Sequence, residues 1–394
     1  MGDVAVEAAT TTDQLVFDSA ELLATHVDLE PLIQDGIRCH GGFDTAGGYV
    51  SPRTLHRTPA IDAWQAQHLR VTGAPLVDIG LNTFGAHYPN VEQSKILLRA
   101  GVRDPFIATL TRIGTVEGFG SFLRYSTVPD IQRFFDDDIS ATAIGHLDKG
   151  LIEAHARDEA GHPEAAEAGH DTMWFIARDI AFEHPMTDDL TSEMLFRMGI
   201  TPANGVAPDF AALRSNAIAN RVLPTDIDFD LESLLNRMVR LLLIEISAFH
   251  TFTWAEGLLS DHDLVAGDGR AANMVSYIRS DETPHVRYLT TVLSEIRQHT
   301  IVGADGTKHG GADVIDALWA PAVAQSRGEG RSNLLDLTWA EIVRSLEGRS
   351  DADDLLAEFD AAGTTHRLID GTWVDPTAGD VLDMESIVGG TVAP

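Results

Sequence analysis

The sequence predicts a nearly all-α fold with four long helices at its core. From about residue 91 to about residue 298, apolar residues recur at spacings of three and four, whereas the alternation typical of strands is sparse throughout the chain. With 394 residues, 44% of them hydrophobic, the chain can bury a large core. We expect a helical and loop extension at 1–90, a four-helix core at 91–300, and a helical extension with a tail at 301–394.

Each of the four core helices is expected to carry an apolar face. Phe106, Leu110 and Ile113 lie at helical spacing on the first helix, and Glu117 continues the same face. The other three helices are expected at about 144–180, 231–259 and 271–298. Additional helices are expected at 18–33, 61–71, 312–346 and 353–359.

A five-residue pattern, D-E-x-x-H, occurs twice, at 158–162 and at 281–285. On a helix, positions i and i+3 lie on one face about one turn apart, so Glu159 would be presented together with His162, and Glu282 together with His285. A single E-x-x-H is expected by chance in a chain of this size, but two copies preceded by Asp are not. The repeat therefore predicts two helices that face a shared site.

Two further glutamates precede these motifs on apolar helical faces. Glu117 lies 42 residues before Glu159, and Glu245 lies 37 residues before Glu282. A carboxylate on an apolar face is costly unless it is paired or bound to a metal. Both are candidate metal ligands, and the alternative for each is a buried ion pair or a position at the helix edge.

Together these residues form a set of four carboxylates and two imidazoles. Such ligands suit iron or manganese better than zinc, and four glutamate charges match two divalent ions. The candidate metal ligands are Glu117, Glu159, His162, Glu245, Glu282 and His285.

In the order Glu, D-E-x-x-H, Glu, D-E-x-x-H, the chain resembles the ferritin-like di-iron carboxylate oxygenase and oxidase superfamily, and within it the small-molecule N-oxygenases and monooxygenases. The resemblance covers about residues 91 to 298 and implies a ferritin-like four-helix bundle with additional N- and C-terminal helices. It implies that Glu159 and Glu282 bridge two irons as the catalytic carboxylates, and that each motif His binds one iron.

The resemblance also assigns a role to the aspartate of each motif, which orients the ligand His of the opposite helix. Asp158 would orient His285, and Asp281 would orient His162. The alternative for both aspartates is a solvated helix position.

The chain departs from the family pattern inside both motifs. Gly161 and Pro284 stand where relatives often have Arg, and Pro163 directly follows the first motif. Proline in a helix interior removes a hydrogen bond and kinks the helix. The prolines therefore predict either paired kinks beside the metals or helices that end there.

Two other histidines lie near the first motif. His155 is one turn before Glu159 and faces the same side, so it is either an extra metal ligand or a residue that contacts the substrate or another ligand. Arylamine N-oxygenases have a ligand His one turn before the second motif, where this chain has Ile278. His170 would lie about 16 Å from Glu159 along a continuous helix, which favours a polar core or tunnel position over a ligand.

The composition argues against several other classes of protein and of metal site. The net charge of −32 disfavours binding to nucleic acid or to anionic membranes. A single cysteine, Cys39, excludes an intrachain disulfide and a thiolate metal cluster. No signal peptide or membrane span is recognised in the sequence, so a cytoplasmic protein is expected.

The expected function is O2-dependent oxidation of a small organic molecule in a biosynthetic pathway, by hydroxylation, N-oxygenation or oxidative cleavage. It would use two Fe ions, or one Mn and one Fe, with O2 as co-substrate and a reductase or ferredoxin as electron donor. The alternatives are a ferroxidase or metal-storage protein and a metal-free helical scaffold. The flanking helices either cover the bundle or form a homodimer.

Overall fold

The computed structural model describes residues 14–120, 123, 128–185 and 210–376. Over these residues the fold is mainly helical, which confirms the helical class, and it includes three small antiparallel sheets. The ends of the predicted N-terminal and C-terminal extensions lie outside the described residues. Within the described ranges, no helix combines the length and the apolar character that a membrane crossing requires.

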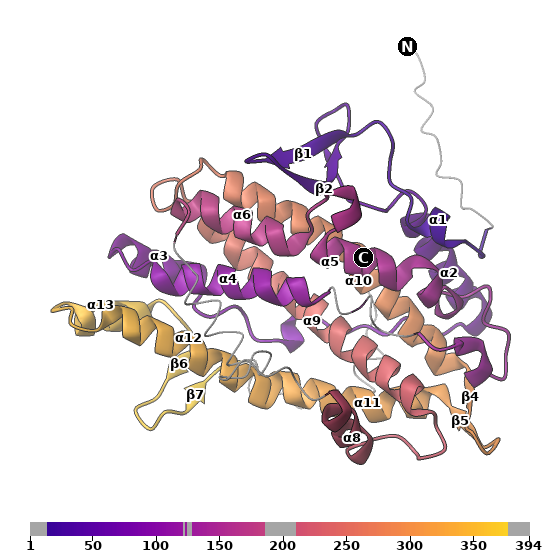
Figure 1. Ribbon diagram of the computed structural model, residues 1–394. Helices are drawn as coiled ribbons and strands as arrows, with labels where there is room; N and C mark the ends of the chain where they lie inside the picture. The colour runs from indigo at the N-terminus through magenta and orange to yellow at the C-terminus, as the bar shows by residue number, and fades with distance from the viewer. Residues whose placement is uncertain (1–13, 121–122, 124–127, 186–209, 377–394) are drawn as a thin grey trace, which may run out of the picture.

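The α-helices differ widely in length, and two of them, α9 and α10, run through the whole molecule (Figure 1). The helices are α1 (Ser19–Leu22), α2 (Arg57–Thr72), α3 (Val91–Arg99), α4 (Asp104–Gly118), α5 (Ile152–Ala160), α6 (His170–Phe182), α8 (Phe210–Ala219), α9 (Phe229–Leu259), α10 (Arg270–Gln298), α11 (Gly311–Gln325), α12 (Arg331–Leu346) and α13 (Ala352–Ala361). Short 3-10 or π segments are η1 (Leu81–Thr83), η3 (Ile131–Phe134), η4 (Ile144–His146), η5 (Leu147–Leu151), η6 (Pro163–Ala165) and η7 (Ser326–Gly330).

Four helical segments pack side by side in the centre of the molecule. α9 packs along α10, α10 packs against α6, and α6 packs against α4, while α5 leads into α6 (Figure 1). On the outside, α2 and α11 cover α10, and α12 covers α4. The central segments are those that the sequence predicts as the helical core.

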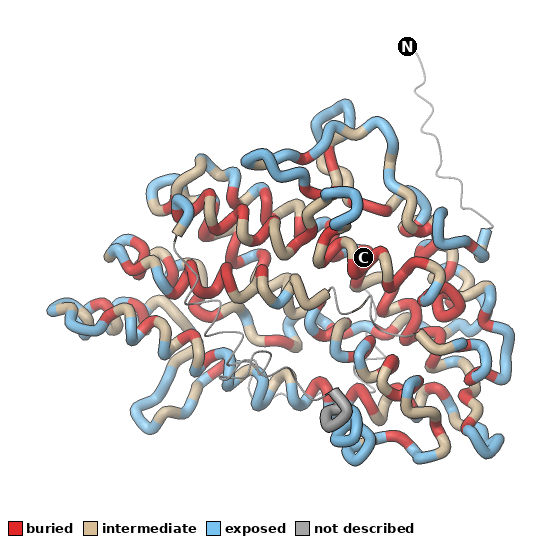
Figure 2. The backbone as a smooth tube through the Cα atoms, in the orientation of Figure 1, coloured by how far each residue is buried: buried red, intermediate tan, exposed pale blue. Residues whose placement is uncertain are grey.

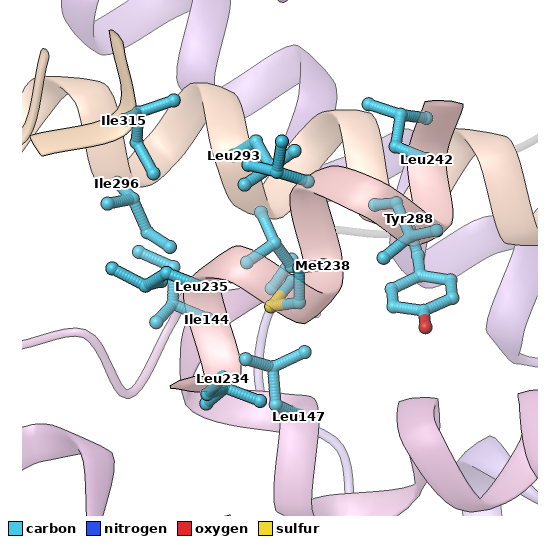
Figure 3. Close-up of a cluster of buried hydrophobic side chains, with 14 of the residues drawn as sticks. Ile144, Leu147, Leu234, Leu235, Met238, Leu242, Tyr288, Leu293, Ile296 and Ile315 are labelled. Atoms are coloured by element: carbon cyan, nitrogen blue, oxygen red, sulfur yellow. The ribbon is translucent and has the colours of Figure 1, made fainter. Parts of the chain in front are cut away.

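Two separate hydrophobic clusters fill this core. One cluster contains the first half of α9 and the last turns of α10, and part of it, including Ile144, Leu235 and Ile315, is drawn in Figure 3. The other contains the last turns of α9 and the first half of α10, together with α4 and α6. Figure 2 shows buried residues on each of these central helices. Between the two clusters, α9 contributes Glu245, and α10 contributes Asp281, Glu282 and His285, all of them buried.

The N-terminal segment differs from the expectation of a helix at 18–33. α1 ends at Leu22, and the chain then forms a three-stranded antiparallel sheet of β1 (Glu30–Gln34), β2 (Ile37–Phe43) and β3 (Tyr49–Val50). The remaining strands form hairpins: β4 (Thr300–Val302) with β5 (Lys308–Gly310), and β6 (His366–Arg367) with β7 (Trp373–Val374).

This sheet attaches to the loop that precedes α6. The backbone N–H of His40 donates to the carbonyl of Ala168, and the N–H of Ala168 donates to the carbonyl of Arg38. β2 is thereby fixed beside the start of α6, and the segment that follows it reaches the polar centre of the molecule.

The helix expected at 144–180 is interrupted at the first motif. α5 ends at Ala160, Gly161 adopts a φ of 70°, and a loop returns the chain to the end of α5 before α6 begins at His170. Gly169 packs so closely there that a Cβ would lie 2.7 Å from the carbonyl oxygens of Asp158 and Glu159. The assumption of one continuous helix is therefore wrong for the first motif. The second motif lies within α10, which continues through Pro284.

Candidate metal centre

A cluster of carboxylates and imidazoles lies between the two hydrophobic clusters. Each residue offers a ligand atom, and within each of two overlapping groups these atoms lie within 4.8 Å of one another. The first group is His155, Glu159, Glu245 and His285. The second group is Glu117, Glu159, His170 and Glu282.

The first group brings together α5, α9 and α10. The Nε2 atom of His155 lies 3.1 Å from Glu245 Oε1 and 3.4 Å from Glu159 Oε1. The Nδ1 atom of His285 lies 3.3 Å from the same Glu159 oxygen. The rings of His155 and His285 stack at 3.8 Å between their centroids, so both imidazoles face the carboxylates from one side.

The second group adds α4 and α6. The Nδ1 atom of His170 lies 3.0 Å from Glu282 Oε1, 3.5 Å from Glu159 Oε1 and 4.0 Å from Glu117 Oε2. Glu117 is near the end of α4, where Gly120 approaches the Glu159 side chain so closely that a Cβ would collide with it. Gly114 packs against Phe175 on α6 in the same way. These glycines let α4 approach α5 and α6.

Glu159 and Glu282 connect the two groups. Glu159 belongs to both groups. Glu282 directs its two oxygens to different histidines, Oε1 to His170 and Oε2 to His285, the latter at 2.7 Å. The two carboxylates expected to bridge a pair of metals therefore lie in the middle of the cluster.

Each of the three histidines has a polar partner at its second nitrogen. His285 Nε2 lies 2.9 Å from Asp158 Oδ2, and His155 Nδ1 lies 2.9 Å from the Tyr288 hydroxyl. In Figure 3 the Tyr288 hydroxyl points away from the neighbouring apolar side chains. His170 Nε2 lies 3.5 Å from Asp281 Oδ2. Partners of this kind fix the ring plane and the tautomer of a metal-ligating imidazole.

Residues of the N-terminal segment hold the aspartates that contact these histidines. The Asp281 carboxylate contacts His40 Nε2 at 3.0 Å and accepts a hydrogen bond of 2.8 Å from the Tyr49 hydroxyl. Asp158 accepts a hydrogen bond of 2.8 Å from Arg53 Nε and pairs with Arg57 Nη2 at 2.8 Å. The sheet, the segment that follows it and the start of α2 thus stabilise both aspartates, which are fully buried.

The aspartate pKa values follow from these contacts. Burial alone would raise the pKa of Asp158, but the charges of Arg53 and Arg57 hold it well below its usual range. Burial likewise opposes ionisation of Asp281, yet its hydrogen bonds with His170 and His40 lower the pKa to about 2. Both aspartates are therefore ionised acceptors at neutral pH.

The four glutamates do not share one protonation state. Burial, and then the charge of Glu159, raises the pKa of Glu117 well above its usual range. Burial and the charge of Glu282 raise the pKa of Glu245 to about 7. Burial and the Glu159 charge also oppose ionisation of Glu282, but His170 and His285 lower its pKa to about 2.

The imidazoles respond in the opposite direction. Burial disfavours the charged form of His170, but the carboxylates of Glu282 and Glu159 raise its pKa well above the usual range. The pKa of His285 rises to about 10, against its burial and the charge of His155, because Glu282 and Asp158 favour the imidazolium. The cluster thus needs protons or cations to balance its carboxylates, and two divalent cations would leave the imidazoles neutral, the form in which they bind metals.

The donor set fits such cations. Several inward-facing atoms are buried and have no hydrogen-bond partner among the described residues: Nε2 of His155, Nδ1 of His170, and Oε1 of Glu159. Buried polar atoms are normally paired, and unpaired ones need an explanation. Carboxylate oxygen with neutral imidazole suits iron or manganese.

The structure brings most of the sequence-predicted residues together, namely Glu117, His155, Glu159, Glu245, Glu282 and His285. It does not bring His162 to the cluster. The His162 side chain is 24% exposed, and its Nε2 lies 3.8 Å from the exposed carboxylate of Glu164. Because α5 ends before His162, the expected position one turn after Glu159 does not exist there, and His170 faces the cluster instead.

The outer contacts require one matching correction. Asp158 contacts His285 as expected, but Asp281 lies beside His170 and His40, not beside His162. Sequence reasoning also missed His40, Arg53, Arg57 and Tyr49. The breakers Gly161, Pro163 and Gly169 are the local signal that the helix stops and that His170 begins a new one.

No protein-family model matches the chain, and neither the curated proteins nor the solved structures contain a significant match to it.

Proposed function

We propose that this cluster holds two iron ions and that the protein is an O2-dependent oxidoreductase acting on a small organic molecule. The observation that carries the proposal is the arrangement of four glutamates and three histidines in two groups that share Glu159, with unpaired buried atoms directed inward. The resemblance of the motif order to the di-iron superfamily supports it. So does the packing of α4, α5 with α6, α9 and α10, which we propose to be a ferritin-like bundle.

In this proposal the residues of the chain divide the ligand positions between two metals. His170 and Glu117 would hold one ion, and His285, His155 and Glu245 the other, with Glu159 and Glu282 between them. His155 is thereby proposed as a ligand, because its Nε2 faces two carboxylates of the cluster. A manganese and iron pair would satisfy the same donors.

Two ferrous ions, when bound, supply electrons for the reduction of O2. The overall reaction we propose inserts one oxygen atom into a C–H or N–H bond of the substrate, and the other oxygen leaves as water. Two protons and two electrons complete the balance, and the electrons come from an external reductant of the reductase or ferredoxin type.

The protein's own contribution is to orient the imidazoles and to exclude water. Asp158, Asp281 and Tyr288 fix the outer nitrogens of the three histidines. Side chains of Glu159, Glu245 and Glu282 are at most 7% exposed, so solvent is excluded from the centre. The Glu117 side chain, at 16%, is the most open of the four glutamates.

The test is to count metals per chain by mass spectrometry after expression with added iron and purification without chelator. We expect about two irons per chain, the number that four glutamate charges balance. The purified protein should then consume O2 when it is given a reductant and a substrate.

Two results would redirect the proposal. Absence of tight Fe(II) binding would favour the metal-free scaffold, in which the cluster is a network of buried ion pairs. Rapid mineral growth under excess Fe(II), with no dependence on an organic substrate, would favour a ferroxidase or storage protein.

A further inference from the structure

A cavity of about 390 Å³ reaches the candidate metal centre at Glu117. It lies among α4, α9, α12 and the segment 84–88, which approach one another on one side of the central helices (Figure 1). Its volume is within the range of roughly 300–1,000 Å³ common for small-molecule sites. Since Glu117 is the most open of the four glutamates, the cavity meets the cluster at the point where a substrate could approach it.

Two residues of the cavity lining carry buried hydrogen-bond donors that have no acceptor among the described residues. Trp174 is fully buried, and its Nε1 has no partner among the described residues. Tyr88 is 5% exposed, and its hydroxyl likewise has none. Trp174 Nε1 can only donate, so the group that completes it must be an acceptor.

The charged residues of the lining are mostly basic, in contrast to the chain as a whole. The chain has 28 basic and 60 acidic residues, but the cavity is lined by Arg112, Arg327 and Arg331 with Glu117 as the acidic residue. Arg112 pairs with Glu341 at 2.7 Å, and Arg331 pairs with Asp375 at 2.7 Å. Arg112 also donates to the second Glu341 oxygen and to the Thr109 hydroxyl, and Arg331 donates to the Ala86 carbonyl. A guanidinium has five donor hydrogens, so each of these arginines keeps donors for a further acceptor.

His87 adds no competing charge to this lining. Its ring stacks on Trp254 at 3.9 Å between centroids. Burial, with the nearby charges of Arg331 and Arg112, lowers the pKa of His87 to about 3, against a hydrogen bond to the Pro89 carbonyl. The ring is therefore neutral at physiological pH.

Most of the remaining wall is apolar, with Ile113 and Val116 from α4, Ile244 and Phe252 from α9, and Leu334 from α12. An apolar wall gains free energy by covering apolar ligand surface, whereas the donors fix the orientation of a polar group.

We propose that this cavity is the substrate site and that it takes a mainly apolar organic acid, whose oxygen atoms accept hydrogen bonds from Trp174, Tyr88 and the arginines. The inference rests on the proposed function, because it treats the cavity beside Glu117 as the approach to the metal centre. It goes further by naming the class of substrate and the residues that select it.

The experiment measures ligand binding by calorimetry on the full-length protein as purified, without O2, so that no turnover occurs. The probes are decanoate, decan-1-ol and decylamine, which share one apolar chain and differ in the head group. We expect decanoate to bind at least about tenfold more tightly than decylamine, because the arginines repel a cation and pair with an anion. Equal binding of the two, or tighter binding of the amine, would overturn the substrate class.

Two tryptophan variants locate the site. Trp174→Phe removes the unpaired donor and should weaken decanoate binding several-fold. Trp319→Phe is the matched control, because Trp319 is also fully buried with an unpaired Nε1 but does not line this cavity. Equal affinity in the two variants would show that decanoate binds elsewhere. If Trp174→Phe fails to fold, Tyr88→Phe removes the second donor and tests the same point.

Metal content is measured on the same samples, which separates this inference from the proposed function. Two irons per chain without preferential decanoate binding would reject the substrate class alone. Decanoate binding that depends on Trp174 in a chain that takes up no metal would retain the cavity as an acid-binding site and reject the oxidoreductase.

Discussion

Gly169 packs directly against Gly161, at the point where the loop after α5 returns to the helix it left. The loop therefore leaves the end of α5 and returns to nearly the same place, so α6 starts beside the end of α5. This contact is what brings His170 close to Glu159, although a continuous helix would separate the two by several turns.

Substitution of Gly169 should displace His170. In Gly169→Ala the added Cβ meets backbone atoms of α5, which cannot move aside as a flexible side chain can. We expect a loss of about 1–3 kcal/mol in the free energy of unfolding, and weaker metal binding. Urea denaturation and metal analysis check this. Gly80→Ala is the control, because an added Cβ there meets nothing within 4 Å and its φ of −61° is ordinary.

Removal of His170 and removal of His162 should have different effects. In His170→Ala we expect the metal content to fall to about one ion per chain or less, because an imidazole of the proposed metal centre is lost. In His162→Ala we expect unchanged metal content, since that side chain lies outside the cluster. Equal loss in the two variants would mean that His162, the histidine of the first D-E-x-x-H motif, is a ligand after all.

Replacement of Asp158 should affect both stability and metal affinity. Asp158→Asn removes the charge that Arg53 and Arg57 face in a buried site, at a cost of about 3–5 kcal/mol. It also weakens the orientation of His285, for which a loss in metal affinity of about 10–100-fold is expected. Asp62→Asn, which removes an exposed partner of Arg287, should leave both quantities nearly unchanged.

Metal removal should destabilise the protein. The metal-loaded state gains stability in proportion to RT ln(1 + [L]/Kd), about 2.7 kcal/mol when free metal is at 100 times Kd. Treatment with chelator should therefore lower Tm, and added Fe(II) should restore it. An identical Tm in both states would contradict a metal centre within the folded core.

Glu295 should make stability depend on pH. Burial raises its pKa to about 8, although the backbone N–H groups of Ala143 and Ile144 donate to it. Between about pH 4.5 and about pH 8, the folded state therefore keeps the proton of Glu295, whereas the unfolded state has released it. The contribution of protonated Glu295 to the free energy of unfolding is complete below this pH window and is lost as the pH rises through it.

The corresponding variant is Glu295→Gln, which resembles the protonated carboxyl at every pH. Across the window, the variant should gain stability relative to the wild type by up to about 1.4 kcal/mol per pH unit. Urea denaturation at several pH values measures this slope. Glu256→Gln on α9 is the control, and an unchanged slope in Glu295→Gln would mean that the Glu295 carboxyl is already ionised in the folded state.

The sequence was most informative where helices are long and uninterrupted. The expected helices at 231–259 and 271–298 correspond within two residues to α9 (Phe229–Leu259) and α10 (Arg270–Gln298), because apolar periodicity over many turns defines both. Pro284 did not end α10. The proline lies within a helix that packs against α9 and α6, and this packing outweighs the single hydrogen bond it removes.

The first motif was misinterpreted because periodicity cannot detect a loop that leaves a helix and returns to it. Gly161 and Gly169 permit that loop, and its effect on His170 depends on tertiary contacts. The partners of the motif aspartates were equally hidden. Arg53 lies 105 residues from Asp158, and His40 lies 241 residues from Asp281, so no local pattern connects them.

The position of the polar cluster between two hydrophobic clusters has a consequence for cooperativity. One half of α9 and one half of α10 lie in each apolar cluster, and the buried residues between those halves include Glu245, Asp281, Glu282 and His285. The metal ions would connect two hydrophobic clusters that could otherwise unfold separately. Unfolding of the loaded protein should then be a single transition, and hydrogen exchange after metal removal should reveal two halves that open independently.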